Sequence, residues 1–242
     1  EGKGYGKRQG SCRPMNEEAV VLAREETERG EVVLRCRRGA AGPVYEIISN
    51  GCFLMASSNA LSARQLAHLT LEPIVGQRSW RVLIGGLGLG YTLQAALEHP
   101  EVASVEVVEI EPLIVAWART YFGPLNGEAL ADPRVSVTIA DLARFVETAS
   151  NSYQAILLDI DNGPRWLVFE DNAAVYERPT LERIRALLTP GGVLGAWAAE
   201  RAPDFLAELE RIFLWADEKA VCEEDEGGRT VEYLICLLYT SD

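Results

Sequence analysis

From Arg81 onward, short apolar strands alternate with amphipathic helical stretches, and this alternation limits the fold more than any other feature of the chain. Alternating β and α units are typical of a parallel sheet covered by helices on both faces. The run Ala155–Leu158 is apolar throughout, as expected of a central parallel strand buried on both faces. The expected strands are 82–84, 105–108, 135–137, 155–158, 193–196, one near 220, and 231–237. We therefore expect an α/β fold with a doubly wound, mostly parallel, seven-stranded Rossmann-like sheet.

The segment before this sheet has the pattern of a small antiparallel β region. Asn50-Gly51 separates two apolar runs, and Asn-Gly is a strong hairpin signal because both turn residues adopt positive φ. Arg29-Gly30 marks an earlier turn, and Ser62 is expected to cap a short helix that ends near Leu69.

Both ends of the chain differ from the rest in character. Residues 1–14 are Gly-rich and basic and precede Met15, so we interpret them as a non-native leader. Residues 238–242 are interpreted as a non-native tail. Between them we expect a β-hairpin region over 15–60 and a Rossmann-like domain over 61–237.

Charge and composition exclude several classes of function. Lys and Arg number 23 against 36 Asp and Glu, a formal net charge of −13. Such a surface repels phosphate backbones and anionic lipids, so neither nucleic acid nor a membrane is an expected partner. The five cysteines are scattered without a Cys-x-x-Cys pair, and only His68 and His99 supply imidazoles, so we expect no metal site. Neither a signal peptide nor an apolar run near the roughly 20 residues of a membrane span is present, and we expect a cytoplasmic protein.

A glycine-rich loop follows the first strand of the expected sheet. It lets the backbone turn tightly and approach a ligand closely, ahead of a helix N-terminus, which suits a nucleoside or nucleotide. The dinucleotide pattern Gly-x-Gly-x-x-Gly fails, because counting from Gly86 its last position is Tyr91. A merely structural β-to-α turn is the alternative. The candidate ligand-contacting glycines are Gly85, Gly86, Gly88 and Gly90.

Acidic residues end the next two strands. Glu109 lies about 20 residues beyond the glycine loop, where an acid can accept hydrogen bonds from both ribose hydroxyls. The alternative is a solvated carboxylate near the N-terminus of the following helix. Asp141 and Leu142 follow the third strand. Asp141 can cap the next helix and can also accept the exocyclic amine of adenine, because a carboxylate has two oxygens.

Two carboxylates, Asp159 and Asp161, follow the apolar fourth strand. They are candidates for a base that takes a proton from an amine nucleophile, since burial or a neighbouring carboxylate tunes the pKa of such a group. The alternative is that Asp159–Pro164 simply forms a turn.

Together these motifs resemble the class I fold that binds S-adenosylmethionine, and more narrowly the spermidine synthase-like family. The motifs are Gly-Gly-x-Gly-x-Gly at 85–90, Val-Glu-Ile-Glu-Pro at 108–112, Tyr-Phe at 121–122, Asp-Pro-Arg-Val at 132–135, Asp159 through Gly163-Pro164, and Leu-x-Pro-Gly-Gly at 188–192. The resemblance implies that Glu109 binds the ribose, Asp141 the adenine amine, and that Asp159 activates the nucleophile. It further implies S-adenosylmethionine or its decarboxylated form as co-substrate, a small amine acceptor, a role in polyamine biosynthesis, and a homodimer or larger assembly.

Three positions depart from the family pattern. The acid that holds the amine of the decarboxylated nucleoside is replaced by Gly88, a Gln by Leu54, and a channel Tyr by Ala63. Three hypotheses follow: an aminopropyl (or related alkyl) transferase acting on an amine, a small-molecule methyltransferase on the same nucleoside site, and a non-catalytic nucleoside-binding protein.

Overall fold

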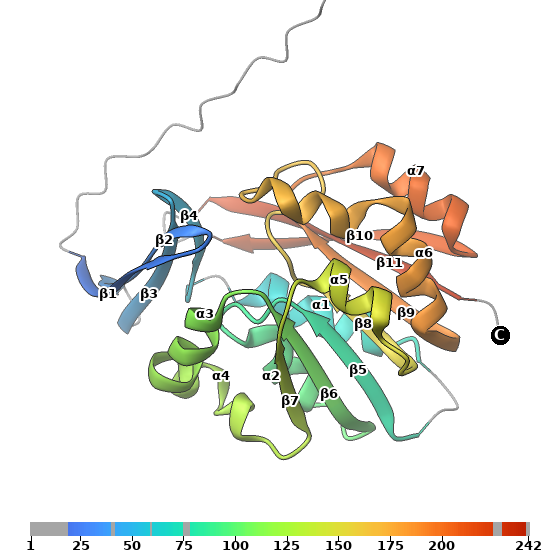
Figure 1. Ribbon diagram of the computed structural model, residues 1–242, viewed down its shortest axis with the longest axis horizontal. Coiled ribbons are helices and arrows are strands. Elements are labelled where there is room, and N and C mark those ends of the chain that lie inside the picture. Colours follow the sequence, from blue (N-terminus) through green and yellow to red (C-terminus); the bar gives the residue numbers. More distant parts are fainter. Residues whose placement is uncertain (1–18, 40–41, 59, 75–77, 225–228, 241–242) are drawn as a thin grey trace, which may run out of the picture.

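The computed structural model describes residues 19–39, 42–58, 60–74, 78–224 and 229–240, and these ranges form two sheets (Figure 1). The larger sheet has seven strands in the order β10-β11-β9-β8-β5-β6-β7. The five strands from β9 to β7 run parallel, and β11 and β10 complete the sheet with antiparallel pairings. The expected fold class is confirmed. The strands are β5 (Trp80–Gly85), β6 (Val102–Glu109), β7 (Val135–Ile139), β8 (Tyr153–Leu158), β9 (Leu188–Ala198), β10 (Trp215–Glu224) and β11 (Thr230–Tyr239).

Helices cover both faces of this sheet because its central strands are apolar on both sides. In β8, Ala155 and Leu157 face one core, whereas Ile156 and Leu158 face the other, and all four are fully buried. The first core contains residues of α1 (Leu61–Leu71), α2 (Tyr91–Leu97) and α3 (Pro112–Trp117). The second contains residues of α5 (Leu142–Thr148), α6 (Arg178–Leu187) and α7 (Pro203–Ile212).

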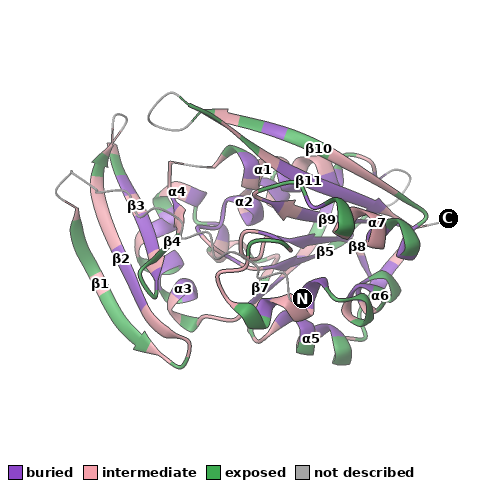
Figure 2. Ribbon diagram, turned by 90° about the horizontal axis from the view of Figure 1, so that it is seen from above, coloured by how far each residue is buried: buried purple, intermediate pink, exposed green. Residues whose placement is uncertain are grey.

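The smaller sheet is an antiparallel meander of β1 (Val20–Thr27), β2 (Gly30–Gly39), β3 (Gly42–Ser49) and β4 (Cys52–Ala56). The predicted Asn-Gly hairpin is present, with φ of 49° at Asn50 and 75° at Gly51. Figure 2 shows the sheet standing beside α3 and α4 (Gly123–Asn126), with β1 as its exposed outer strand. Its inner face joins the first core through Leu34 and Ile47.

Several local expectations need correction. Helix α1 is preceded by Ala60 without a side-chain cap, and Ser62 is buried inside the helix, so Ser62 is not the cap. The stretch 113–121, which the sequence pattern predicts as a single helix, is interrupted: α3 ends at Trp117, and a π-helical segment (Ala118–Phe122) leads into α4.

Strand β11 extends to Tyr239, two residues beyond its predicted end. Residues 1–14, interpreted above as a leader, lie outside the described ranges. None of the helices in those ranges combines the length and apolar character needed to cross a membrane.

Candidate functional site

A cavity of about 420 Å³ opens at the carboxyl ends of β5, β6 and β8, beside the turns of the small sheet. This volume lies in the range of small-molecule sites. The edge is also where the chain reverses its direction of winding, because β5 lies between β6 and β8. The residues that line the cavity include Arg29, Ser49, Met55, Gly86, Gly88, Glu109, Asp141, Leu142, Asp159, Asp161, Phe169 and Trp197.

The glycine loop after β5 has a shape that side chains would obstruct. Gly86 has a φ of 87°, and a Cβ there would lie 2.1 Å from the carbonyl oxygen of Asp159. Gly85 is equally confined, since its Cβ would lie 2.5 Å from Leu142 Cδ2. Gly90 adopts φ 86° and starts α2. The loop backbone therefore passes directly under the ends of β8 and α5, and Gly86 and Gly88 line the cavity.

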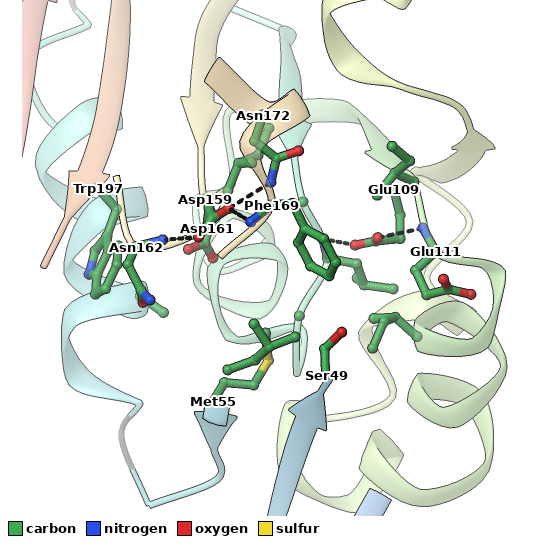
Figure 3. Close-up of a pocket in the computed structure, with 18 of the residues that line it drawn as sticks. Ser49, Met55, Glu109, Glu111, Asp159, Asp161, Asn162, Phe169, Asn172 and Trp197 are labelled. Carbon is green, nitrogen blue, oxygen red and sulfur yellow. Dashed lines mark hydrogen bonds between the residues drawn. The ribbon is translucent and has the colours of Figure 1, made fainter. Parts of the chain in front are cut away.

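Glu109 ends β6 at one side of the cavity (Figure 3). Its Oε2 accepts a hydrogen bond from the Leu87 amide, and its Oε1 accepts one from the Glu111 amide, both at 2.8 Å. Only 7% of the residue is exposed, so the alternative of a solvated carboxylate is wrong. Burial raises the pKa of Glu109, while the amide hydrogen bonds act in the opposite direction. The carboxylate is thus fixed in place and retains lone pairs for a ligand.

Asp141 caps α5, as predicted, by accepting a hydrogen bond from the Arg144 amide to Oδ1 at 3.0 Å. Its other oxygen takes no part in this cap, and Asp141 and Leu142 both line the cavity. Leu142 is buried and packs over the glycine loop.

Asp159 follows β8 and points into the cavity next to Thr92 of α2. Oδ2 of Asp159 lies 2.6 Å from Oγ1 of Thr92. Burial raises the pKa of Asp159, and the hydrogen bond from Thr92 lowers it. A carboxyl group with a raised pKa in a cleft is suited to accept a proton.

Asp161 has a different environment from Asp159. It adopts φ 58°, and it accepts hydrogen bonds from the amides of Val168 and Phe169 at 2.7 and 3.1 Å and from Asn172 Nδ2 at 2.8 Å. These bonds draw the segment after β8 into a compact loop, with Phe169 over the cavity (Figure 3). These hydrogen bonds suit Asp161 to hold this loop, whereas the sequence predicts it, together with Asp159, as a candidate base.

The wall beneath Gly88 is apolar. A Cβ on Gly88 would lie 3.2 Å from Met55 Sδ, and Leu54 and Ala63 line the cavity with it. The three departures from the family pattern therefore lie in one cavity.

Sequence reasoning did not identify Thr92, Arg29, Ser49, Phe169 or Trp197 as site residues. Trp197 lies near Asp159 and Asn162, on the side of the cavity away from Glu109 (Figure 3). Its ring packs against Tyr233 with centroids 5.3 Å apart. The Arg29 and Asn50 turns were recognised only as turns, and no local pattern shows what a turn faces.

In the described ranges, His, Cys, Asp and Glu side chains do not gather in groups that could hold a metal ion.

Comparisons with known proteins agree with this architecture. The family model "Spermine/spermidine synthase domain" matches residues 60–203, more than half of the chain. Putrescine N-methyltransferase 3 of Nicotiana tabacum is 34% identical over 132 residues, which is 53% of this chain and 32% of that protein. Spermidine synthase 1 of Pisum sativum is 31% identical over 132 residues, 53% of this chain and 36% of that protein.

The match thus spans about a third of the length of these curated relatives. The crystal structure of spermidine synthase from Thermotoga maritima superposes with a TM-score of 0.74 at 18% identity, covering 91% of this chain and 73% of that one. The chain belongs to the spermine/spermidine synthase family.

Proposed function

We propose that the protein is a transferase that moves an alkyl group from an S-adenosylmethionine-type nucleoside to a small amine. One observation carries the proposal: the carboxylates of Glu109 and Asp159 line opposite sides of a single cavity, one fixed by amides and one beside a hydroxyl. Relatives named spermidine synthase and putrescine N-methyltransferase support an amine as acceptor.

The residues at the Glu109 side suit a nucleoside. The glycine loop provides a surface without side chains, Glu109 would accept the ribose hydroxyls, and Asp141 Oδ2 would accept the adenine amine. Leu142 offers an apolar contact for the base. The cavity and its donors and acceptors therefore fit the nucleoside that the family resemblance implied.

The Asp159 side suits an amine. When bound, the nucleoside would supply a sulfonium group, whose sulfur leaves readily with the electrons of its carbon–sulfur bond. The amine nitrogen forms the new bond to that carbon, and Asp159 takes the proton that the nitrogen loses. Trp197 presents an aromatic face on this side, which can hold a cationic amine before it is deprotonated. Asp161 acts indirectly by keeping Phe169 in position.

Two alkyl groups fit this scheme. Aminopropyl transfer requires a site for the ammonium of the decarboxylated nucleoside. Methyl transfer uses the intact nucleoside. Glycine at position 88, next to Met55, favours methyl transfer because an acid at that position would repel the carboxylate of the intact nucleoside.

Product analysis tests the proposal. Purified protein is incubated with each nucleoside and a panel of di- and polyamines, and the nucleoside product is identified by mass spectrometry. Methylthioadenosine indicates aminopropyl transfer, and S-adenosylhomocysteine indicates methyl transfer. Binding without either product would identify a non-catalytic nucleoside-binding protein and contradict the proposed transfer.

A further inference from the structure

Two buried hydrogen-bond donors at the cavity have no hydrogen-bond partner among the described residues. Nη2 of Arg29, in the β1–β2 turn, and Oγ of Ser49, at the end of β3, are shielded and unbonded within the described residues. Both residues line the cavity, and Ser49 is 1% exposed. Buried polar atoms are normally hydrogen-bonded, so two such atoms at one cavity indicate a ligand group that would bond them.

The position of Arg29 follows from its contact with Phe169. Cζ of Arg29 lies 4.3 Å from the centroid of the Phe169 ring. Figure 3 shows that ring between Asp161 and Glu109, with the Ser49 hydroxyl directed toward it from below. The guanidinium therefore lies against the Phe169 ring, and both residues line the same cavity as Glu109 and Asp159.

The charges around Arg29 make it distinctive. Among the described residues that line the cavity, it is the only Lys, Arg or His, whereas five are acidic: Glu109, Glu111, Asp141, Asp159 and Asp161. Arg29 forms no ion pair within the described part of the chain. A guanidinium and a hydroxyl together match a carboxylate, which accepts charge-assisted hydrogen bonds.

We propose that Arg29 and Ser49 form a subsite for the carboxylate of an amino-acid-bearing nucleoside. The proposal rests on the proposed nucleoside site and specifies its ligand. The surrounding acids suit the sulfonium and ammonium groups of intact S-adenosylmethionine, and Arg29 suits its one negative charge. The decarboxylated nucleoside has no carboxylate to pair with Arg29. Its ammonium group would lie near the guanidinium without that negative charge to compensate it.

The consequence is a choice of reaction. With the carboxylate held by Arg29, the intact nucleoside is the preferred co-substrate, and the group delivered is methyl. The acceptor nitrogen bonds to the methyl carbon, the methyl–sulfur bond breaks with its electrons moving to sulfur, and the amine proton passes to Asp159.

Calorimetric titration with three neutral-sulfur compounds tests the subsite. S-adenosylhomocysteine and its decarboxylated form differ only in the carboxylate, and methylthioadenosine lacks both the carboxylate and the amine. We expect S-adenosylhomocysteine to bind at least about tenfold more tightly than its decarboxylated form. Arg29→Met should remove that difference, Arg29→Lys should retain part of it, and Ser49→Ala should reduce it several-fold.

Methylthioadenosine affinity should stay within about twofold in all these variants, because it does not reach the subsite. Arg24→Met is the matched control: it removes one arginine from the same hairpin, where Arg24 is exposed and pairs with Glu31. It should leave the preference unchanged.

The subsite is overturned if the wild type binds S-adenosylhomocysteine and its decarboxylated form equally, or if Arg29→Met keeps the wild-type preference. Methylthioadenosine binding in the same experiment would show that the nucleoside site itself still stands. If none of the three compounds binds, the proposed function itself fails, and the subsite with it. Circular dichroism checks folding, and Ser49→Ala decides the question if Arg29→Met does not fold.

Discussion

Oγ1 of Thr92 lies 2.6 Å from Oδ2 of Asp159. Oγ1 of Thr92 also lies 3.1 Å from the carbonyl oxygen of Ala63. A hydroxyl has one proton, so Thr92 can donate to only one of these acceptors at a time. With Asp159 ionised, Thr92 donates to it. Once Asp159 holds a proton, it can donate to Thr92, which then donates to Ala63. Thr92 can therefore bond to either protonation state of Asp159, and in the proposed reaction it would act as a positioning residue.

Thr92→Val should lower kcat about tenfold and raise the pKa seen in the kcat/KM profile, because the hydrogen bond that lowers the pKa of Asp159 is lost. Thr92→Ser keeps the hydroxyl and should restore both values. A profile unchanged in Thr92→Val would show that the hydroxyl does not act on the base.

Asp159→Asn should reduce kcat by a factor of about 10² or more, since an amide cannot accept the proton. Methylthioadenosine affinity should remain within a few-fold, which calorimetry measures. Activity that survives the change would exclude Asp159 as the base.

The same variant gives a pH-dependent change in stability. Burial raises the pKa of Asp159, so the folded state binds its proton at a higher pH than the unfolded chain does. The Asp159 carboxyl therefore contributes most to stability below its unfolded pKa, in the ordinary carboxyl range. That contribution is lost as the pH rises through the higher pKa of the folded state. Asp159→Asn should melt at a higher temperature than the wild type at pH 7.5, with the difference shrinking toward pH 4. A difference that is constant with pH would contradict the assignment.

Glu109→Gln should weaken methylthioadenosine binding about tenfold, because one of the two oxygens proposed to accept the ribose hydroxyls becomes a donor. Glu111→Gln is the matched control: Glu111 lines the same cavity, but its carboxylate accepts from the Leu113 amide at the start of α3. We expect the control to bind within about twofold of the wild type. Equal effects in the two variants would remove Glu109 from the ribose site.

Gly86→Ala should destabilise the protein by more than about 4 kcal/mol, because its Cβ would meet the Asp159 carbonyl oxygen. Gly51→Ala is the control, since Gly51 also has positive φ but its Cβ would meet nothing within 4 Å. That variant should cost only about 1–2 kcal/mol of backbone strain. Chemical denaturation measures both values, and similar losses would show that the close approach to β8 is unimportant.

Gly88→Asp should shift nucleoside preference toward the decarboxylated form by about tenfold, because it places an acid where an ammonium would lie. Gly88 has φ 51°, a conformation that Asp tolerates better than most residues. Gly88→Asn adds similar bulk without charge and should leave the preference unchanged. A shift of equal size in both variants would point to bulk, not charge.

The sequence predicted the features that depend on local pattern. Alternating strands and helices fixed the sheet type, and the ends of β6 and β8 put Glu109 and Asp159 at one edge because parallel strands share direction. The Asn50-Gly51 turn followed from the φ angles that hairpins require.

Features that depend on how segments dock could not be read in this way. Asp161 bonds to amides seven and eight residues later, and nothing in the spacing shows that the intervening loop closes. Ser62 has the residue type of a cap, but the cap position is taken by Ala60, two residues earlier, and Ser62 packs inside. Arg29 reaches Phe169 only because the small sheet stands against α3, a long-range arrangement without a local pattern.

The cavity draws its walls from two separate stretches of chain, and this arrangement bears on how new specificities arise in evolution. The large sheet presents Glu109, Asp141 and Asp159 from strand ends that the core constrains on both faces. The small sheet contributes Arg29 from a turn and Ser49 beside one, and turns tolerate substitution better than cores do. In the proposed transferase, a change at a few hairpin residues would therefore alter which alkyl group is delivered, while the strand ends proposed to hold the nucleoside stay as they are.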